Sequence, residues 1–347
     1  MKLVYFGNKL SLHGRSKSVL ETLEPLIADF CEVKTFSSVR NQYLRLLDMI
    51  YHFFKEGLVS DTIMIDVYST KNFYFAYILG WLCKIYKKPY ILFLHGGNLP
   101  RRYKKSKGKI HQIFKPAACI VAPSNYLKSF FESQGFKIKL IPNVIDLQKF
   151  PFLERRFCRP RLLYVRGFGK IYNPKMTVRA VKELQREYPN VELAMIGSDI
   201  DGSLDEVQGL INHLKLEKNI LILGRKTQEE WTQISKNFDI MISNPLIDNA
   251  PVSIIEGMAL GLLIISTNVG GVSYIVNDKY DGMLVKSGDH LAVAAAVREL
   301  LNNPVLCSSL QRNARRKAEL FSWKNICPEW QNLFNYCSER KIEVKEG

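Results

Sequence analysis

Short apolar segments of strand length alternate with longer segments of helical apolar spacing along the whole chain, and this alternation most constrains the fold. In the first half the strand-like segments are KLVYFG (2–7), CEVKTFS (31–37), TIMIDVY (62–68), YILFLHG (90–96), ACIVAPS (118–124) and KIKLIPN (137–143). In the second half they are RLLYVRG (161–167), VELAMIG (191–197), NILILG (219–224), DIMISN (239–244) and LLIIST (262–267). Strands that alternate with helices favour parallel sheets covered on both faces. The sequence therefore predicts an α/β protein with two doubly wound, Rossmann-like sheets.

The length of the chain favours two domains, because 347 residues exceed what one ordinary hydrophobic core organises. The segment DLQKFPFLERRFCRPR (146–161) is rich in Arg and Pro and is typical of a linker. We expect an N-terminal domain over 1–155, a C-terminal domain over 156–320 and a closing segment over 321–347. Parallel sheets of this kind bind ligands outside the carboxyl ends of their strands, so we look for a site there.

Positive charge is concentrated in the first half of the chain. The net charge is +16, and residues 1–160 hold 26 Lys and Arg against 11 Asp and Glu. Residues 67–131 contain twelve Lys and Arg and no acid, including the run RRYKKSKGK (101–109). Such a half attracts polyanions, which are nucleic acids, anionic lipid headgroups or phosphate-bearing substrates. For the basic run alone, a solvated loop is an equal alternative.

Several features indicate the compartment and the absence of a metal. Seven scattered cysteines without CxxC spacing indicate reduced thiols, and the first residues lack a signal-peptide cleavage region. The longest apolar run, FYFAYILGWLC (73–83), is about half of what a membrane span needs. We find no cluster of side chains with metal-ligand spacing. We therefore expect a cytoplasmic protein with no metal and no cofactor.

The segment DNAPVSIIEGMALG (248–261) places two carboxylates around an otherwise apolar helix. A glutamate at Glu256 is costly to desolvate unless it has a partner. Five helical residues rise about 7 Å, so Asp248 and Glu256 lie at separated depths along one groove. That separation suits a ligand with hydroxyls at both ends and a diphosphate between them. The alternative is that Asp248 caps the helix and Glu256 pairs with a buried cation.

Three segments of the chain resemble the GT4-type (glycosyl transferase group 1) family of retaining glycosyltransferases with the GT-B fold. PLIDNAPVSIIEGMALGLLIISTNVGGVSYIV (245–276) resembles the donor-site signature of that family, with an acid eight positions ahead of a glutamate and a Gly-Gly turn. Residues 123–150 are similar to the end of the family's first domain, and residues 162–180 to its entry into the second. The resemblance implies two Rossmann-like domains facing a cleft, with a closing helix at 321–341 that crosses back onto the first domain.

The resemblance also implies roles for the acidic residues. Glu256 accepts hydrogen bonds from the nucleotide ribose, because both oxygens of a carboxylate can engage a vicinal diol. Asp248 faces the transferred sugar, and Asn249 shares this contact. This chain departs from the family at Asp248, where Glu is usual, and at Tyr274, where an acid is common.

The diphosphate of the donor needs cations or converging N–H groups. Arg166 and Lys170 follow the strand at 161–165, where the family places an Arg and a Lys that clamp the pyrophosphate, and Lys175 is a rival for Lys170. Gly270 and Gly271 can present backbone amides to an anion, although an ordinary turn explains the dipeptide equally well.

In the first half, the loop after the first strand contains Gly7 and Gly14, which permit close approach of the backbone to a phosphate. Arg15 or His13 could support that phosphate. His95 lies at the carboxyl end of a strand before two glycines, where the family has a histidine that lines the sugar site. A general-acid role and a positional role both stay open for His95.

The expected reaction follows from the resemblance. We expect the catalytic residues to be His95, Asp248, Arg166 and Lys170, with cation neutralisation of the leaving diphosphate in place of a metal. The family retains the anomeric configuration, and we expect same-face attack in which the leaving phosphate accepts the acceptor's proton. A UDP-sugar is favoured slightly over a GDP-sugar on family frequency.

The expected acceptor is a glycan or a polyprenyl-diphosphate-linked molecule in surface polysaccharide or glycolipid synthesis. Within NQYLRLLDMIYHFFKEG, one broad face of the helix carries Leu44, Leu47, Ile50, Tyr51 and Phe54. Core packing is the preferred interpretation of this face. Together with the acid-free basic stretch, it still permits peripheral docking at the anionic inner face of the plasma membrane.

Three other functions stay open. A sugar-nucleotide epimerase of the same architecture would turn over the donor without an acceptor. A nucleic-acid-binding protein would explain the basic half, although neither an RNP-like aromatic pattern nor zinc-finger spacing is present, and we expect no nucleic acid partner. A catalytically silent relative would explain the departures at Asp248 and Tyr274.

Overall fold

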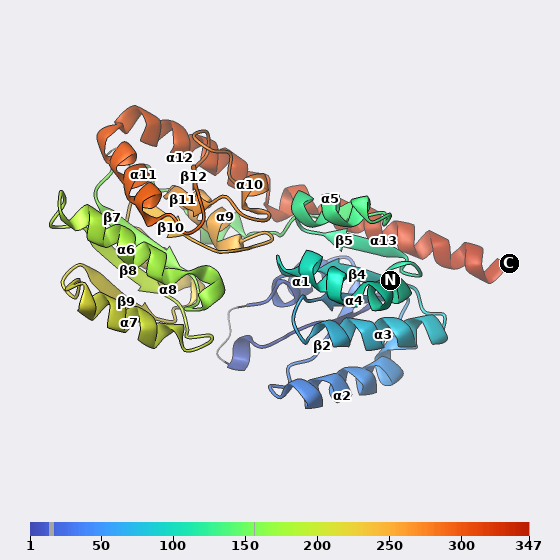
Figure 1. Ribbon diagram of the computed structural model, residues 1–347. Helices are drawn as coiled ribbons and strands as arrows, with labels where there is room; N and C mark the ends of the chain where they lie inside the picture. Colours follow the sequence, from blue (N-terminus) through green and yellow to red (C-terminus); the bar gives the residue numbers. More distant parts are fainter. Residues whose placement is uncertain (14–16, 156, 347) are drawn as a thin grey trace. The chain divides into compact units, whose positions relative to one another are not determined.

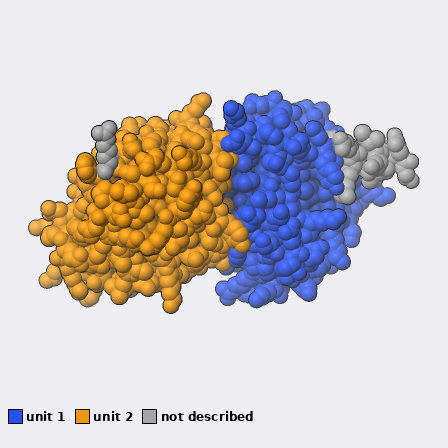
Figure 2. Space-filling model, turned by 90° about the horizontal axis from the view of Figure 1, so that it is seen from above, with its two compact units in different colours: residues 1–144, 323–347 blue, residues 145–322 orange. Residues whose placement is uncertain are grey.

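The computed structural model describes residues 1–13, 17–155 and 157–346 (Figure 1). The chain divides into two compact units, Met1–Val144 with Trp323–Gly347 and Ile145–Ser322 (Figure 2). Each unit contains one six-stranded sheet in which all strands are parallel. The predicted fold class, with two Rossmann-like sheets, is confirmed.

The sheet of the first unit has the strand order β2-β1-β3-β4-β5-β6. Its strands are β1 (Lys2–Phe6), β2 (Glu32–Phe36), β3 (Thr62–Val67), β4 (Tyr90–Leu94), β5 (Cys119–Ala122) and β6 (Lys139–Leu140). Every residue of β3 and β4 is buried, as expected for apolar strands with helices on both faces. The order reverses between β1 and β3, and such a switch point is where parallel sheets bind ligands.

Helices cover both faces of this first sheet. They are α1 (Val19–Ile27), α2 (Gln42–His52), the π-helical turn η2 (Phe53–Gly57), α3 (Phe73–Ile85), α4 (Leu99–Phe114) and α5 (Asn125–Ser133), with a 3-10 turn η1 (Ser11–His13). Buried residues of α2 to α5 share one core cluster. Those of α1 share another cluster with the C-terminal helix α13 (Trp323–Glu346).

The C-terminal helix belongs to the first unit, as the predicted fold requires. Trp330 of α13 is fully buried, and its ring lies edge-on to Phe93 of β4 with 5.4 Å between the centroids. Lys139 of β6 and Glu329 of α13 form an ion pair at 2.6 Å. The chain therefore crosses back from the second unit to complete the core of the first.

The sheet of the second unit has the order β12-β11-β10-β7-β8-β9. Its strands are β7 (Arg161–Val165), β8 (Glu192–Ile196), β9 (Ile220–Gly224), β10 (Ile240–Ser243), β11 (Leu263–Thr267) and β12 (Met283–Val285). Its helices are α6 (Pro174–Gln185), α7 (Ser203–His213), α8 (Gln228–Ser235), α9 (Val252–Ala259), α10 (Val272–Ile275), α11 (His290–Asn302) and α12 (Pro304–Glu319), with turns η3 (Leu147–Lys149) and η4 (Lys170–Tyr172). The switch point lies between β7 and β10.

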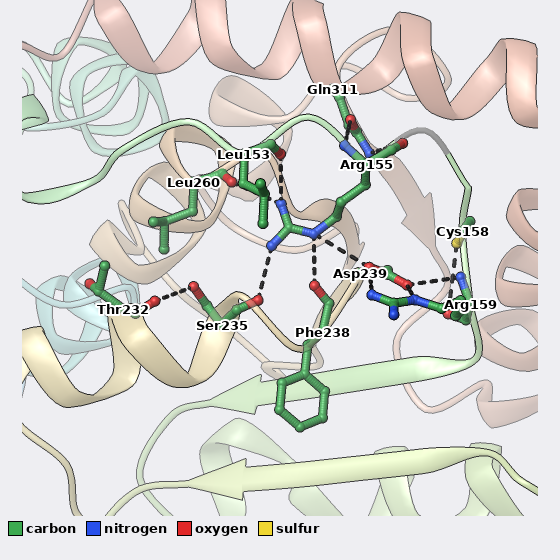
Figure 3. A network of polar contacts seen from close by, with 10 residues as sticks. All are labelled: Leu153, Arg155, Cys158, Arg159, Thr232, Ser235, Phe238, Asp239, Leu260 and Gln311. Atoms are coloured by element: carbon green, nitrogen blue, oxygen red, sulfur yellow. Dashed lines mark hydrogen bonds and ion pairs between the residues drawn. The ribbon is translucent and has the colours of Figure 1, made fainter.

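The segment expected to be a linker is anchored in the second unit. The buried Arg155 guanidinium donates hydrogen bonds of 2.7–2.9 Å to four carbonyl groups, those of Leu153, Ser235, Phe238 and Leu260 (Figure 3). Its Nε lies 3.6 Å from the buried Asp239 carboxylate, which also pairs with Arg159 at 2.8 Å. Residues 145–155, which were expected in the first domain, lie in the second unit. The hydrogen bonds of Arg155 inside the second unit hold the end of this segment there.

The apolar face of helix α2 is exposed, whereas core packing was the preferred interpretation. The fully buried residues of this helix are Arg45 and Met49, whereas Leu44, Leu47 and Tyr51 are more than half exposed. Arg45 is held inside by hydrogen bonds to Asn8 Oδ1 and to the carbonyls of residues 39 and 40. The expectation that this face packs in the core is wrong, because satisfied donors let an arginine occupy the inner side of the helix.

Across the described residues, the apolar helices are too short or too charged to cross a bilayer.

Candidate functional site

The carboxyl ends of β7 and β10 bring together an arginine and an aspartate at the switch point of the second sheet. Arg166 follows β7 directly, and Asp248 lies in the loop after β10. Arg166 Nη2 lies 2.5 Å from Asp248 Oδ2, and both side chains are partly buried. Asp248 therefore pairs with Arg166, and the helix α9 has no side-chain cap. This arrangement excludes the alternative in which Asp248 serves as the helix cap.

An aromatic ring supports the arginine. The Arg166 guanidinium carbon lies 4.5 Å from the ring centroid of Tyr172, a cation–π contact, and Nη1 lies 3.5 Å from Ser253 Oγ on α9. The backbone N–H of Leu246 donates to the carbonyl of Ile171 at 2.8 Å, which joins the η4 turn to the loop that carries Asp248. Three segments distant in sequence therefore fix the direction of one guanidinium.

The Gly-Gly turn packs against the backbone of the Asp-Asn dipeptide. Gly271 N–H donates to the carbonyl of Asp248 at 2.9 Å. A Cβ at Gly271 would lie 1.6 Å from the carbonyl oxygen of Asn249, and Gly270 adopts a φ of +53°. Both positions therefore require glycine to shape the loop. The Gly271 N–H already donates a hydrogen bond within the protein, so its expected contact with an anion stays a prediction.

Glu256 lies on α9 in a half-buried position. Burial raises its pKa from 4.5 to about 7, and the hydrogen bond from Gln228 together with the charge of Arg166 only partly opposes this shift. Gln228 Nε2 donates to Oε1 at 3.2 Å, and among the described residues this is the carboxylate's one hydrogen bond. Within residues 1–13, 17–155 and 157–346, Glu256 does not form an ion pair with Arg166 or with another cation, so the alternative in which a buried cation satisfies it is not observed there. The carboxylate retains acceptor capacity for a ligand.

The two lysine candidates for the diphosphate contact both point to α7. Lys175 Nζ lies 2.5 Å and Lys170 Nζ 3.5 Å from the carboxylate of Glu206. The Lys170 side chain is 69% exposed. The structure therefore joins Arg166 with Asp248 but does not bring either lysine to that pair, and the choice between Lys170 and Lys175 stays open.

In the first unit, the switch point between β1 and β3 holds a buried aspartate that organises His95. Asp66 of β3 accepts hydrogen bonds from Tyr5 at 2.7 Å, from Tyr68 at 2.6 Å and from Nε2 of His95 at 2.7 Å. The side chains of Asp66 and His95 are 2% and 13% exposed. Burial, together with the charge of Asp66, raises the pKa of Tyr5 and of Tyr68 well above the ordinary range, so both remain donors. Because Nε2 faces Asp66, the other ring nitrogen of His95 is the one that can meet a ligand.

Gly7 also serves the Asp66 cluster. A Cβ at this position would lie 2.3 Å from Asp66 Oδ2, and the Gly7 N–H donates to the carbonyl of Phe36 at 2.7 Å. The close approach predicted for Gly7 therefore occurs, but to a carboxylate of the protein. Gly14 and Arg15 lie outside the described residues, and His13 Nε2 contacts the carbonyl of Ser38 at 2.8 Å.

Four side chains of these two arrangements were missed from the sequence, namely Asp66, Tyr172, Gln228 and Ser253. Asp66 is the one acid within the apolar strand TIMIDV, and a charge inside a buried strand is a usable indicator of a site. Tyr172 and Gln228 lie in loops and at a helix start without a distinguishing pattern. Within 1–13, 17–155 and 157–346, acidic, histidine and cysteine side chains do not gather in threes that could hold a metal.

Comparison with known proteins supplies the family. The sequence profile described as Glycosyl transferases group 1 matches residues 152–317, and the profile described as Glycosyltransferase Family 4 matches residues 33–149. The two matches fall on the two halves of the chain and together include most of it.

Individual relatives are distant. An uncharacterized glycosyltransferase of Methanocaldococcus jannaschii is 24% identical over 72% of this chain and 69% of its own length. The UDP-Gal:alpha-D-GlcNAc-diphosphoundecaprenol alpha-1,3-galactosyltransferase of Escherichia coli is 26% identical over 52% of this chain, but over only 49% of its own length. The structure of Anabaena HepE in complex with UDP-glucose superposes with a TM-score of 0.79 over 98% of this chain and 100% of that chain, at 16% identity. At that identity the likeness shows the fold alone.

Proposed function

Because this chain belongs to the GT4-type (glycosyl transferase group 1) family of glycosyltransferases, we propose that it transfers a hexose-type sugar from a UDP-sugar to a glycan or lipid-linked acceptor. The reaction is proposed to retain the anomeric configuration and to need no metal. The observation that carries the proposal is Glu256, a half-buried carboxylate with a pKa raised to about 7 and acceptor capacity left over, on a helix beside Arg166.

In this proposal the donor nucleotide binds outside the carboxyl ends of β7 and β10. The ionised Glu256 accepts hydrogen bonds from the two ribose hydroxyls, and Arg166 faces the diphosphate. Asp248 and Asn249 contact the sugar hydroxyls. Asp248 holds Arg166 from one side and Tyr172 supports it from another, so its positive charge is fixed before the donor arrives, and such preorganised charge stabilises a leaving group.

The bond that breaks joins the anomeric carbon to the diphosphate oxygen, and the bond that forms joins that carbon to the acceptor oxygen on the same face. The acceptor hydroxyl loses its proton to the departing phosphate, and the products are the glycoside and the nucleoside diphosphate. His95 is proposed as a catalytic residue that acts through the ring nitrogen that Asp66 leaves available. Two named relatives support the substrate class: HepE was crystallised with UDP-glucose, and the name of the Escherichia coli protein specifies a UDP-sugar donor and a diphosphoundecaprenol acceptor.

The test measures UDP release from UDP-glucose, UDP-galactose and UDP-N-acetylglucosamine, with and without a polyprenyl-diphosphate-linked sugar. We expect release that depends on the acceptor, persists in EDTA and yields an α-linked product by NMR. Arg166→Ala should lower kcat/KM by roughly 100- to 1000-fold, whereas Glu299→Ala, at an exposed ion pair on α11, should leave it unchanged. Turnover of the donor to an epimer without acceptor, or loss of activity in EDTA, would contradict the proposal.

A further inference from the structure

Helix α2 and the η2 turn expose a continuous apolar stripe. Residues spaced by three or four positions along one side are Tyr43, Leu47, Tyr51 and Phe54, and Leu44 adjoins them. Their exposed fractions run from 44% for Phe54 to 77% for Tyr43. Burial of the opposite side of the helix against the core fixes this stripe outward.

Helix α3 presents a second stripe beside the first. Tyr74, Trp81 and Ile85 recur at helical spacing on its outer side, and Trp81 is 51% exposed. Tyr86 follows the helix, and its ring meets Phe54 edge-on with 5.5 Å between the centroids. Helices α2 and α3 are in contact, and both cover the same face of the first sheet (Figure 1). The nine side chains of the two stripes, which we name the docking face, are Tyr43, Leu44, Leu47, Tyr51, Phe54, Tyr74, Trp81, Ile85 and Tyr86.

Lysines stand at the docking face without opposing acids. Lys55 Nζ lies 5.7 Å from the ring centroid of Tyr51, and Lys109 Nζ lies 4.8 Å from that of Tyr74. Lys84 is exposed on α3 between Trp81 and Ile85. Residues 67–131, which include α3 and α4, contain no acid.

Two acids lie on α2 and η2, and they do not outweigh the lysines. Glu56 forms an ion pair with Lys34 at 2.8 Å, and Asp48 lies 3.5 Å from Nε2 of His52, which cancels its charge only when the histidine is protonated. The charge left on this side of the first unit is therefore positive, and it lies next to exposed aromatic rings.

We propose that the docking face binds the protein to the surface of an anionic lipid bilayer. Aromatic rings with polar tips and aliphatic side chains enter the headgroup region, while lysines bind anionic headgroups and keep their stems along the apolar surface. This combination matches a lipid interface better than a second protein, whose surface would have to complement both the lysines and the rings. The inference rests on the proposed function in one respect, because a lipid-linked acceptor is presented at such a surface.

Vesicle flotation tests the proposal, with the full chain and vesicles of phosphatidylcholine alone or mixed with phosphatidylglycerol. The wild type should float only with the anionic vesicles, and salt should weaken its binding. Lys55→Gln/Lys84→Gln/Lys109→Gln should weaken partitioning roughly a hundredfold, at about 1 kcal/mol per lysine. Leu44→Gln/Leu47→Gln should weaken it by at least about tenfold. The control Leu291→Gln/Val305→Gln changes leucine and valine side chains that are 56% and 81% exposed in the second unit, and should bind like wild type.

Tryptophan emission gives an independent readout. Trp81 is half exposed, Trp231 and Trp330 are buried, and Trp323 is partly buried against the core cluster that α1 shares with α13. A blue shift on vesicle addition that comes from the docking face should therefore disappear in Trp81→Phe. UDP binding, measured in solution on every variant, separates this proposal from the proposed function. Equal flotation with both vesicle types, or no flotation by a protein that still binds UDP, would overturn the docking proposal and leave the proposed function intact. It would also be overturned if the wild type were a dimer without vesicles and Leu44→Gln/Leu47→Gln made it a monomer, because the face would then join two copies of the chain.

Discussion

Replacing Glu256 by glutamine tests whether the ionised carboxylate lowers the stability of the unliganded protein. Burial raises the pKa of Glu256 from 4.5 to about 7 in the folded protein, against the opposing effects of Gln228 and Arg166. The folded state therefore binds this proton more tightly than the unfolded chain does. The free energy of unfolding consequently falls as the pH rises from 4.5 to 7, and the fall corresponds to about 3 kcal/mol at 1.36 kcal/mol per pH unit.

Glutamine preserves the shape of the side chain and removes this dependence on pH. Above pH 7 the Glu256→Gln variant should be more stable than wild type by about 3 kcal/mol, which raises Tm by about 6–12 °C for a unit of this size. Near pH 4.5 the two proteins should differ by only about 0.4 kcal/mol, because the wild-type carboxyl is then protonated in the folded state and about half protonated in the unfolded chain. Calorimetric melting without ligand, across this pH range, measures the difference.

The matched control is Glu299→Gln, which changes an exposed carboxylate on α11 and should leave Tm nearly unchanged at every pH. UDP affinity should fall in Glu256→Gln even where the variant is more stable, because the neutral amide is a weaker acceptor for ribose hydroxyls. A Glu256→Gln variant that melts at or below the wild-type temperature at about pH 8 would refute the reasoning, since the ionised carboxylate would then stabilise the unliganded fold.

Three further changes have defined outcomes. Asp66→Asn should lower kcat by roughly 10- to 100-fold with little change in KM, because His95 loses the acceptor that fixes its ring; steady-state kinetics would contradict this if KM alone changed. Gly271→Ala should lower the stability of the second unit by about 1–3 kcal/mol in thermal melting, because its Cβ overlaps the carbonyl of Asn249, and an unchanged Tm would show that the loop accommodates it. Arg155→Met should lower the free energy of unfolding by about 3–5 kcal/mol in the same assay, because Asp239 and the other partners of the guanidinium stay buried without it. Below the melting range kcat should stay at the wild-type value, and a loss of kcat would show that this interior network also positions the site.

The donor half of the candidate site was predictable in part. Asp248 and Glu256 stand out because carboxylates are costly in apolar surroundings, whereas Arg166 was named because the family places an arginine after the corresponding strand. The structure joins Arg166 to Asp248, but it places Lys170 near Glu206. That partner lies on α7, far along the chain, and spacing within a loop does not encode which distant carboxylate a lysine reaches.

Residues of the first unit show why periodicity alone was insufficient. The stripe that includes Leu47 has the spacing of a core-facing helix, yet Arg45 occupies the inner side and Leu47 is exposed. Amphipathic spacing identifies two sides of a helix, and only the donors and acceptors of neighbouring segments decide that an arginine can be buried. Asp66 was missed although a charge within a buried strand indicates a site, and its donors Tyr5 and His95 come from other parts of the sheet and meet it only in the fold.

The most direct test of the central claim, that the second unit binds a nucleotide-sugar donor through Glu256, is thermal melting with UDP, GDP, CMP and ADP. A ligand at a hundredfold its dissociation constant adds about 2.7 kcal/mol, which is a clear shift of Tm. The account predicts a shift with UDP in the wild type and in Glu299→Ala, and its loss in Glu256→Ala although the latter still folds. The absence of a shift with every nucleotide, or an equal shift in Glu256→Ala, would contradict the account.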